Sequence, residues 1–151
     1  MPTLRATTWD DPVVGRLAGA QQEEVQARYD GASEPGVPPS GADVAVVLVA
    51  VDDDGTPVGC GALRPLGPGS AEVKRMYVVP PARGRGVARL LLSGLEEEAR
   101  RRGWHLLQLE TGPHQPEAIG LYTSAGYRPV PAFGSYVGLG DDSLFFARDL
   151  R

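Results

Sequence analysis

Residues 72–101 read EVKRMYVVPPARGRGVARLLLSGLEEEARR, a stretch that places a strand, a glycine-rich turn and a helix in direct succession. Glu72 to Val79 is rich in valine and stops at Pro80-Pro81, which is typical of a strand because proline lacks the N–H that a ladder needs. From Gly86 to Arg102, apolar residues recur at helical spacing, which predicts an amphipathic helix. Its polar face carries Glu-to-Arg pairs four residues apart, namely Glu96 with Arg100, Glu97 with Arg101 and Glu98 with Arg102.

The N-terminal side of this stretch predicts one helix and several short strands. Asp11 followed by Pro12 is a helix start, and apolar residues continue at helical spacing as far as Tyr29. A loop is expected over the Gly-, Ser- and Pro-rich residues 31–41. Strands are expected at Thr3 to Thr7, residues 44–51 and Val58 to Leu63, with turns at Asp52 to Gly55 and Pro65 to Ser70.

The C-terminal side adds a second helix and closing strands. Trp104 to Glu110 predicts a strand, and Pro116 begins a helix that ends at Gly126. Closing strands are expected at Tyr127 to Val130 and Ser143 to Leu150. This order predicts one α+β (mixed α/β) domain over residues 1–151, in which the helix makes strands 72–79 and 104–110 parallel neighbours.

Composition excludes several classes of function. The net charge of −4 disfavours a nucleic-acid binder, although Arg83, Arg85 and Arg89 form a local basic cluster. The longest apolar run, residues 44–51, is too short to cross a membrane, and no leader pattern precedes it, so a cytoplasmic location is expected. Cys60 is the single cysteine, and its apolar neighbours favour a core residue over a nucleophile.

The turn before the long helix carries the first functional signal. Amides at a helix N-terminus lack intrahelical partners and favour anions, and Gly84 and Gly86 let a ligand approach the backbone. Such a turn suits a phosphate or diphosphate. A purely structural strand-to-helix turn is equally compatible with the glycines alone. A dinucleotide-binding turn is disfavoured because it belongs near the start of a fold, whereas this one follows several hairpin strands.

Two motifs resemble the GNAT (GCN5-related N-acetyltransferase) superfamily. The first is Arg83-x-x-Gly86-x-Ala88 after a valine-rich strand, which is similar to that superfamily's diphosphate motif. The second is Ala118-Ile119-Gly120-Leu121-Tyr122-x-x-x-Gly126-Tyr127. The sequences of residues 72–78 and 109–112 further resemble those of a bacterial branch of small GNAT proteins.

The resemblance implies a central, mostly antiparallel, bent sheet of about six or seven strands, flanked by about three or four helices. Its parallel pair would splay apart and hold acetyl-CoA in the gap, with no metal. Backbone groups of the strand end would bind the pantetheine arm, amides of the turn and helix start would bind the diphosphate, and an amide side chain before the last helix would contact the arm. In this chain these positions are Met76, Tyr77, Val78, Arg83, Gly84, Arg85, Gly86, Val87, Ala88, Arg89 and Gln115, where the last replaces the family's usual Asn.

The resemblance also suggests catalytic residues. Tyr122 would donate a proton to the leaving thiolate and would also contact the cofactor. Alternatively, Tyr122 is an aromatic residue that only packs in the core. An amine needs a base because its ammonium form has no lone pair, and Glu110 and Glu72 are the candidates, with His114 a weaker one. Each glutamate could instead bond to backbone at the splay.

The acceptor site is less defined. The resemblance points to Tyr29, Arg75, Phe133 and Tyr136 as substrate-binding residues. An arginine facing a pocket would suit a carboxylate, but Arg75 could equally belong to a surface ion pair. The expected function is acetyl transfer to a primary amine of a small molecule by direct attack on the thioester. The alternatives are acetylation of a protein or peptide and a non-catalytic acyl-CoA-binding module, and a homodimer is possible in each case.

Overall fold

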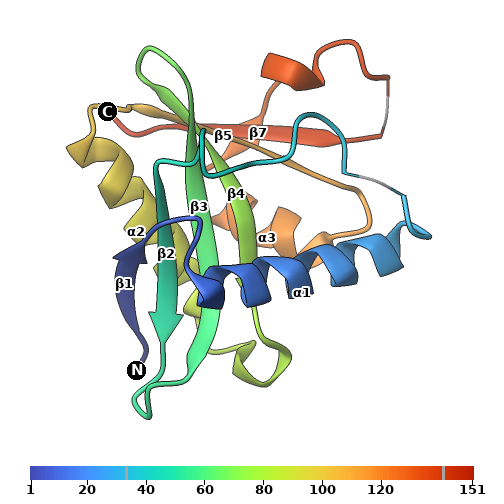
Figure 1. Ribbon diagram of the computed structural model, residues 1–151. Coiled ribbons are helices and arrows are strands. Elements are labelled where there is room, and N and C mark those ends of the chain that lie inside the picture. Colours follow the sequence, from blue (N-terminus) through green and yellow to red (C-terminus); the bar gives the residue numbers. More distant parts are fainter. Residues whose placement is uncertain (33, 141) are drawn as a thin grey trace.

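A computed structural model describes residues 1–32, 34–140 and 142–151 (Figure 1). Its strands are β1 (Thr3–Thr7), β2 (Val46–Val51), β3 (Pro57–Gly67), β4 (Ser70–Val78), β5 (Leu106–Thr111), β6 (Arg128–Pro129) and β7 (Leu144–Asp149). Its α-helices are α1 (Pro12–Arg28), α2 (Val87–Arg101) and α3 (Pro116–Ser124). The strands form one sheet in the order β1-β2-β3-β4-β5-β7-β6, and its β4–β5 pair is parallel whereas the other pairs are antiparallel. The predicted α+β fold with one parallel pair is confirmed.

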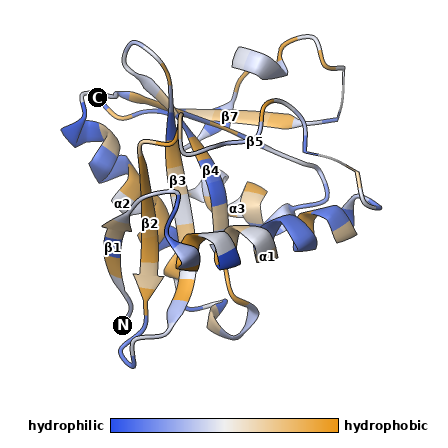
Figure 2. Ribbon diagram, viewed as in Figure 1, coloured by the Kyte–Doolittle hydropathy of each residue, from blue (hydrophilic) through white to orange (hydrophobic). Residues whose placement is uncertain are grey.

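Helices cover both faces of the sheet at β2 and β3. Alternate residues of a strand point to opposite faces, so the buried run of β2 divides between two core clusters. Val46, Leu48 and Ala50 pack with α2 on one face, and Val47 and Val49 pack with α1 on the other. Figure 1 shows α1 and α2 on opposite sides of these strands, and Figure 2 shows β2 hydrophobic along most of its length. A strand buried on both faces therefore appears in the sequence as a continuous apolar run.

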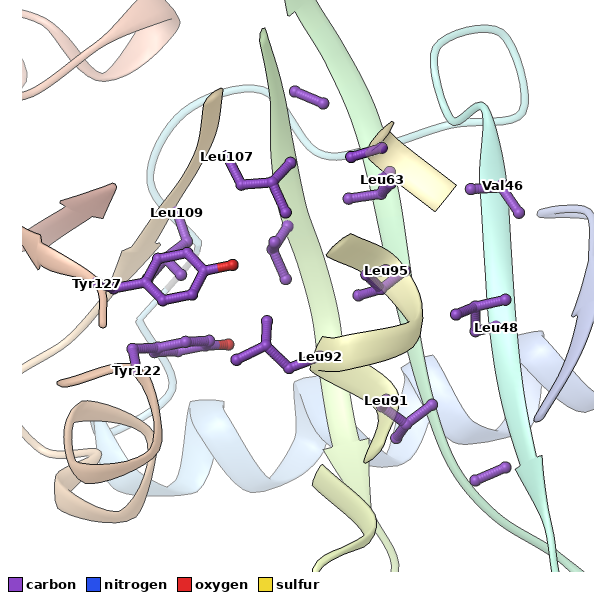
Figure 3. Packing of buried hydrophobic residues seen from close by; sticks show 14 of the residues in the cluster. Val46, Leu48, Leu63, Leu91, Leu92, Leu95, Leu107, Leu109, Tyr122 and Tyr127 are labelled. Atoms are coloured by element: carbon purple, nitrogen blue, oxygen red, sulfur yellow. The ribbon is translucent and has the colours of Figure 1, made fainter. Parts of the chain in front are cut away.

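The core is densest under α2. Leu91, Leu92 and Leu95 are almost completely buried, and Figure 3 shows Leu91 and Leu95 near Leu48 and Leu63 of the central strands, whereas Leu92 points toward Tyr122. Burying one such side chain contributes about 1.5–3 kcal/mol to folding. This helix is therefore a fixed element, and its first turn is held in a defined position relative to β4.

Two of the three predicted ion pairs of α2 are wrong. Glu96 is buried and accepts hydrogen bonds from Tyr127 Oη (2.9 Å) and Arg148 Nη1 (2.9 Å), rather than pairing with Arg100 on the outer face. The prediction followed four-residue spacing and could not detect partners distant in sequence. On the exposed face Glu98 pairs with Arg102 as predicted, and further pairs join Glu98 to Arg101 and Glu97 to Arg100 in place of Glu97 with Arg101.

The predicted turn at residues 65–70 is shorter than expected. β3 continues to Gly67 and pairs with β4 from Ser70, so only residues 68 and 69 lie between the two strands. Pro65 was expected to begin this turn, but it lies within β3, where the register shifts between Pro65 and Gly67. A proline is tolerated at such an irregularity because the ladder does not need its missing N–H there. The remaining strand boundaries differ from the predictions by one or two residues, as is usual at frayed ends.

β4 and β5 separate soon after they meet. They pair at Ser70–Leu106, Ala71–Leu107 and Glu72–Gln108, although β4 continues to Val78 and β5 to Thr111. On its other edge β4 remains paired with β3, with a register shift opposite Cys60 and Ala62. Arg75 lies at this shift with φ of +57°, in the left-handed region, which identifies a bulge. The edge of β4 that faces β5 is therefore left without a strand partner beyond Glu72.

Candidate active site

A cavity of about 610 Å³ opens where β4 and β5 separate. Its walls come from β4, the first turn of α2, the end of β5, α3 and the C-terminal half of α1. It contains most of the residues that the sequence predicted for cofactor, acceptor or catalysis, namely Tyr29, Arg75, Met76, Tyr77, Val78, Arg83, Gly84, Gly86, Val87, Ala88, Arg89, Glu110, His114, Gln115 and Tyr122. Predicted residues that do not line it are Glu72, Arg85, Phe133 and Tyr136.

The glycine turn leaves the start of α2 open. Gly84 and Gly86 have φ of +78° and +80°, a backbone conformation that favours glycine, and a Cβ at either position would meet no other heavy atom. Gly86 is the N-cap and offers no side chain to the amides of the first turn. Amides that a helix leaves unpaired at its N-terminus attract anions. The turn therefore fits a phosphate group in the cavity, with no side chain in its place.

The three arginines near the turn are directed differently. Arg83 donates from Nε to the carbonyl of Val78 (2.9 Å) and pairs with Glu24 of α1 (2.8 Å). Arg89 donates to Ser124 Oγ at the end of α3 (2.8 Å). The side chain of Arg85 instead pairs with Asp52 (3.1 Å) in the turn after β2. Arg83 and Arg89 line the cavity and bridge it to neighbouring helices, whereas Arg85 faces another part of the surface.

Tyr122 lies on the cavity wall with Glu110 close enough to influence it. The ring is buried, packs edge-to-face on Tyr127 at 5.7 Å between centroids, and is shown beside it in Figure 3. Burial raises the pKa of the Tyr122 hydroxyl, and the negative charge of Glu110 raises it further. Ser143 Oγ donates to Glu110 Oε2 (2.7 Å), which orients that carboxylate. A protonated phenol and a carboxylate thus share one end of the cavity.

Glu72 lies behind the cavity wall. It is fully buried and accepts hydrogen bonds from Arg64 Nη2 (2.8 Å) and from the hydroxyl of Tyr136 (2.5 Å). Burial and the charge of Glu72 raise the pKa of the Tyr136 hydroxyl. Tyr136 also packs on Phe133 and Phe145 in an aromatic cluster. Both predicted residues of the C-terminal segment therefore support the wall rather than line the cavity.

Two further predicted residues join α1 to the loop after β5. Tyr29 Oη accepts a hydrogen bond from the amide of His114 (3.0 Å), and the two rings meet edge-to-face. A Cβ on Gly112 would lie 1.7 Å from Tyr29 Oη, so only glycine leaves room for this contact. Gln115, the amide residue predicted before the last helix, is the N-cap of α3 and lines the cavity.

Glu34 and Lys74 are among the cavity residues that the sequence interpretation missed. Glu34, from the irregular segment between α1 and β2, and Lys74 of β4 both line the cavity. Lys74 Nζ donates to Glu34 Oε1 (2.7 Å), and Arg75 binds both oxygens of the same carboxylate (2.7 and 2.9 Å). Lys74 is the single lysine of the chain, and this unusual composition was the one sequence feature that singled it out. No local pattern indicated Glu34.

Residues 1–32, 34–140 and 142–151 contain neither a metal-binding cluster nor a membrane-spanning helix. In that part of the chain, no group of three or more His, Cys, Asp or Glu side chains is arranged to hold a metal ion. None of its helices is long and apolar enough to cross a membrane. Cys60 is fully buried, and burial raises the pKa of its thiol to about 12, so it stays protonated as the sequence interpretation expected of a core residue.

Comparison with known proteins identifies the family. Residues 8–127 match the sequence profile of the Acetyltransferase (GNAT) family, which is most of the chain. The chain belongs to the GNAT acetyltransferase family. Membership implies an acyl-CoA donor. The predicted resemblance is therefore confirmed.

Relatives support this assignment in sequence and in structure. The chain is 45% identical over 97 residues to an "IAA acetyltransferase" from Azospirillum brasilense, a match that covers 64% of this chain and 63% of that protein. It is 37% identical over 57 residues to an aminoalkylphosphonate N-acetyltransferase from Salmonella typhimurium, which covers 38% and 37%. A crystal structure from Klebsiella pneumoniae, described as a candidate acyl-CoA N-acyltransferase, superposes with a TM-score of 0.83 at 34% identity and covers 100% of this chain and 99% of that one. The chain thus matches less than two thirds of the length of these two sequence relatives.

Proposed function

We propose that residues 1–151 form one catalytic domain that transfers an acetyl group from acetyl-CoA to a primary amine of a small molecule. One observation carries this proposal: the unpaired edge of β4 and the open N-terminus of α2 border the same cavity. An extended pantetheine arm can add to a free strand edge through main-chain hydrogen bonds. The diphosphate would then bind the amides from Gly84 to Arg89, where Gly84 and Gly86 leave space.

The reaction follows from the two groups at the other end of the cavity. An amine attacks the thioester carbonyl, so that a C–N bond forms and the C–S bond breaks. Glu110 accepts the proton that the amine loses, directly or through a water, and Tyr122 donates a proton to the departing sulfur. The Tyr122 hydroxyl is protonated at neutral pH, as a proton donor must be, because an ordinary phenol already is and burial raises its pKa further. Glu72 is proposed as support for the wall rather than as the base, because Arg64 and Tyr136 already occupy its carboxylate.

The choice of a small molecule rests on the relatives and on the cavity. The Salmonella relative is named for a small phosphonate amine, and the Azospirillum relative for IAA. In this chain Tyr29 and His114 connect α1 to the loop after β5 beside the cavity, which favours a compact acceptor over an extended peptide.

A thiol-release assay tests the proposal. The purified chain is incubated with acetyl-CoA and a panel of small amines, matched peptides with free N-termini, and buffer alone. We expect amine-dependent release of CoA with small amines and an acetylated product of the corresponding mass. Release with peptides alone would assign the protein to peptide acetylation. Calorimetric binding of acetyl-CoA without release for any acceptor would identify a binding module.

A further inference from the structure

Two consecutive cations of β4 share one carboxylate inside the cavity. Lys74 Nζ and Arg75 Nη1 both contact Glu34 Oε1 at 2.7 Å, and Arg75 Nη2 contacts Oε2 at 2.9 Å. These side chains are largely withdrawn from water, with exposed fractions of 5% for Lys74, 9% for Arg75 and 13% for Glu34. Bidentate contacts of this kind are the geometry with which arginine recognises carboxylate and phosphate groups.

The bulge in β4 creates this pair. Consecutive side chains of a regular strand point to opposite faces, so Lys74 and Arg75 could not ordinarily meet at one group. The left-handed φ of Arg75 and the register shift beside it redirect the second side chain. A backbone conformation that is costly for a non-glycine residue is thus used to bring two cations to one point.

Other carboxylates lie near the pair. Arg64 contacts Glu72 at 2.8 Å and Asp43 at 3.5 Å, and Lys74 contacts Glu72 at 3.7 Å. Among the described residues, Glu34 is the one carboxylate in direct contact with both Lys74 and Arg75. Burial opposes the ionisation of Glu34, but hydrogen bonds from Arg75 and the charge of Lys74 outweigh it, and its pKa is lowered. An anion that takes the place of the Glu34 carboxylate keeps Lys74 and Arg75 compensated, which matters because an uncompensated buried charge is costly.

Glu34 and the two cations that bind it lie on backbone of different kinds. Lys74 and Arg75 belong to a central strand that is paired with β3, whereas Glu34 lies between α1 and β2, outside the helices and strands of the described residues. Pro35 beside it also lines the cavity. Its carboxylate can therefore leave at a smaller structural cost than either cation.

We infer that the acceptor amine carries an oxyanionic group, a carboxylate or a phosphonate, which binds Lys74 and Arg75 in the position that the Glu34 carboxylate occupies. This inference rests on the proposed acetyl transfer and names the substrate class of that reaction. The bound anion holds the acceptor by one end, and its amino group is left to face the thioester. Glu34 acts as the internal competitor that satisfies the two cations while the acceptor site is empty.

The test compares acceptors that differ only in charge. Each amino carboxylate is paired with its carboxamide, and each aminophosphonate with its dimethyl ester, and kcat/KM is measured for both members. We expect the anionic member to be preferred by about 10- to 100-fold, the range for charge-assisted hydrogen bonds. The two sets of pairs show whether a carboxylate or a phosphonate is the better group.

Two variants separate recognition from structure. Glu34→Gln removes the competing charge and should increase the anionic-to-neutral preference, mainly by lowering KM for the anion. Lys74→Met should reduce the same preference by about tenfold or more. Glu23→Gln is the matched control, because this exposed glutamate of α1 does not line the cavity. A purely structural Glu34 would instead lower activity with both members equally.

The outcomes distinguish this inference from the proposed function. CoA release with equal or better use of the neutral members overturns the inference and leaves acetyl transfer intact. If no amine is acetylated, calorimetric binding of the same pairs to the CoA complex replaces turnover, and equal affinities again overturn the inference. A chain that does not bind acetyl-CoA at all contradicts the proposed function itself.

Discussion

The two ends of the cavity are built by different means. At the end proposed for the donor, a free strand edge and the amides of a helix N-terminus form the surface, and Gly84 and Gly86 leave open space there. At the acceptor end, charged side chains from β4 meet a carboxylate from the segment before β2. The donor end suits a ligand common to a whole family, whereas the acceptor end can change through single substitutions. We therefore expect changes at the two ends to be separable in binding and in turnover.

The largest expected effect is at the donor end. Gly86→Glu should reduce acetyl-CoA affinity by about 100-fold or more, because a carboxylate would project toward the diphosphate at the start of α2. Isothermal calorimetry measures the loss. Gly103→Glu is the matched control, since Gly103 also has a positive φ and open space but lies beyond the other end of α2. Equal affinities in the two folded variants would refute the diphosphate site.

The next effect separates chemistry from donor binding. Tyr122→Phe should lower kcat by about 10²-fold or more and leave acetyl-CoA affinity nearly unchanged, because the proposed role of the hydroxyl is to protonate the departing sulfur. Steady-state kinetics and calorimetry together measure this split. Tyr127→Phe is the neighbouring control, since its hydroxyl bonds Glu96 in the core and should affect stability rather than kcat. A fully active Tyr122→Phe enzyme would transfer the role to water or to another group.

The pH dependence sharpens the same assignment. Burial and Glu110 raise the pKa of Tyr122, so the donor stays protonated to a higher pH than an ordinary phenol. As pH rises, kcat should increase while the acceptor amine loses its proton, and no fall caused by the acid should occur below pH about 10. A pH–rate profile at saturating acetyl-CoA checks this. A descending limb between pH 7 and 9 that disappears in Tyr122→Phe would contradict it.

The smallest effect concerns the wall of the acceptor end. Tyr136→Phe removes the hydroxyl that bonds Glu72 and Lys74, which should cost about 1–3 kcal/mol of unfolding free energy. Urea unfolding measures this loss. Acceptor KM should shift because Lys74 is loosened, whereas acetyl-CoA affinity should stay the same. A comparable loss of acetyl-CoA affinity would show that the two ends are not separable.

The sequence indicated the turn before α2 more completely than the contacts of Glu34 and Lys74, for a physical reason. The strand, the glycine turn and α2 are consecutive, so local periodicity and turn chemistry describe the whole unit. Glu34 meets Lys74 across forty residues, and Tyr136 reaches Glu72 across sixty-four. Such contacts depend on how the chain folds back, which no local pattern contains. Arg75 was identified, but its bulge and its partner were not.

The same reason explains the errors in the fold. Glu96 has the spacing of a surface ion pair and is instead buried with Arg148, fifty-two residues away. Pro65 is typical of a turn, but it lies in β3, where an irregularity in the pairing with β4 accommodates it. The positions of helices and strands followed from the periodicity within each element. The surroundings of Glu96 and Pro65 instead depend on parts of the chain that contact them after folding.

The most direct measurement is the crystal structure of the chain with CoA. We expect the diphosphate oxygens within about 2.7–3.2 Å of backbone amides between Gly84 and Arg89, and the pantetheine arm beside the free edge of β4. A diphosphate bound elsewhere, or an arm that does not enter the space between β4 and β5, would contradict the central claim.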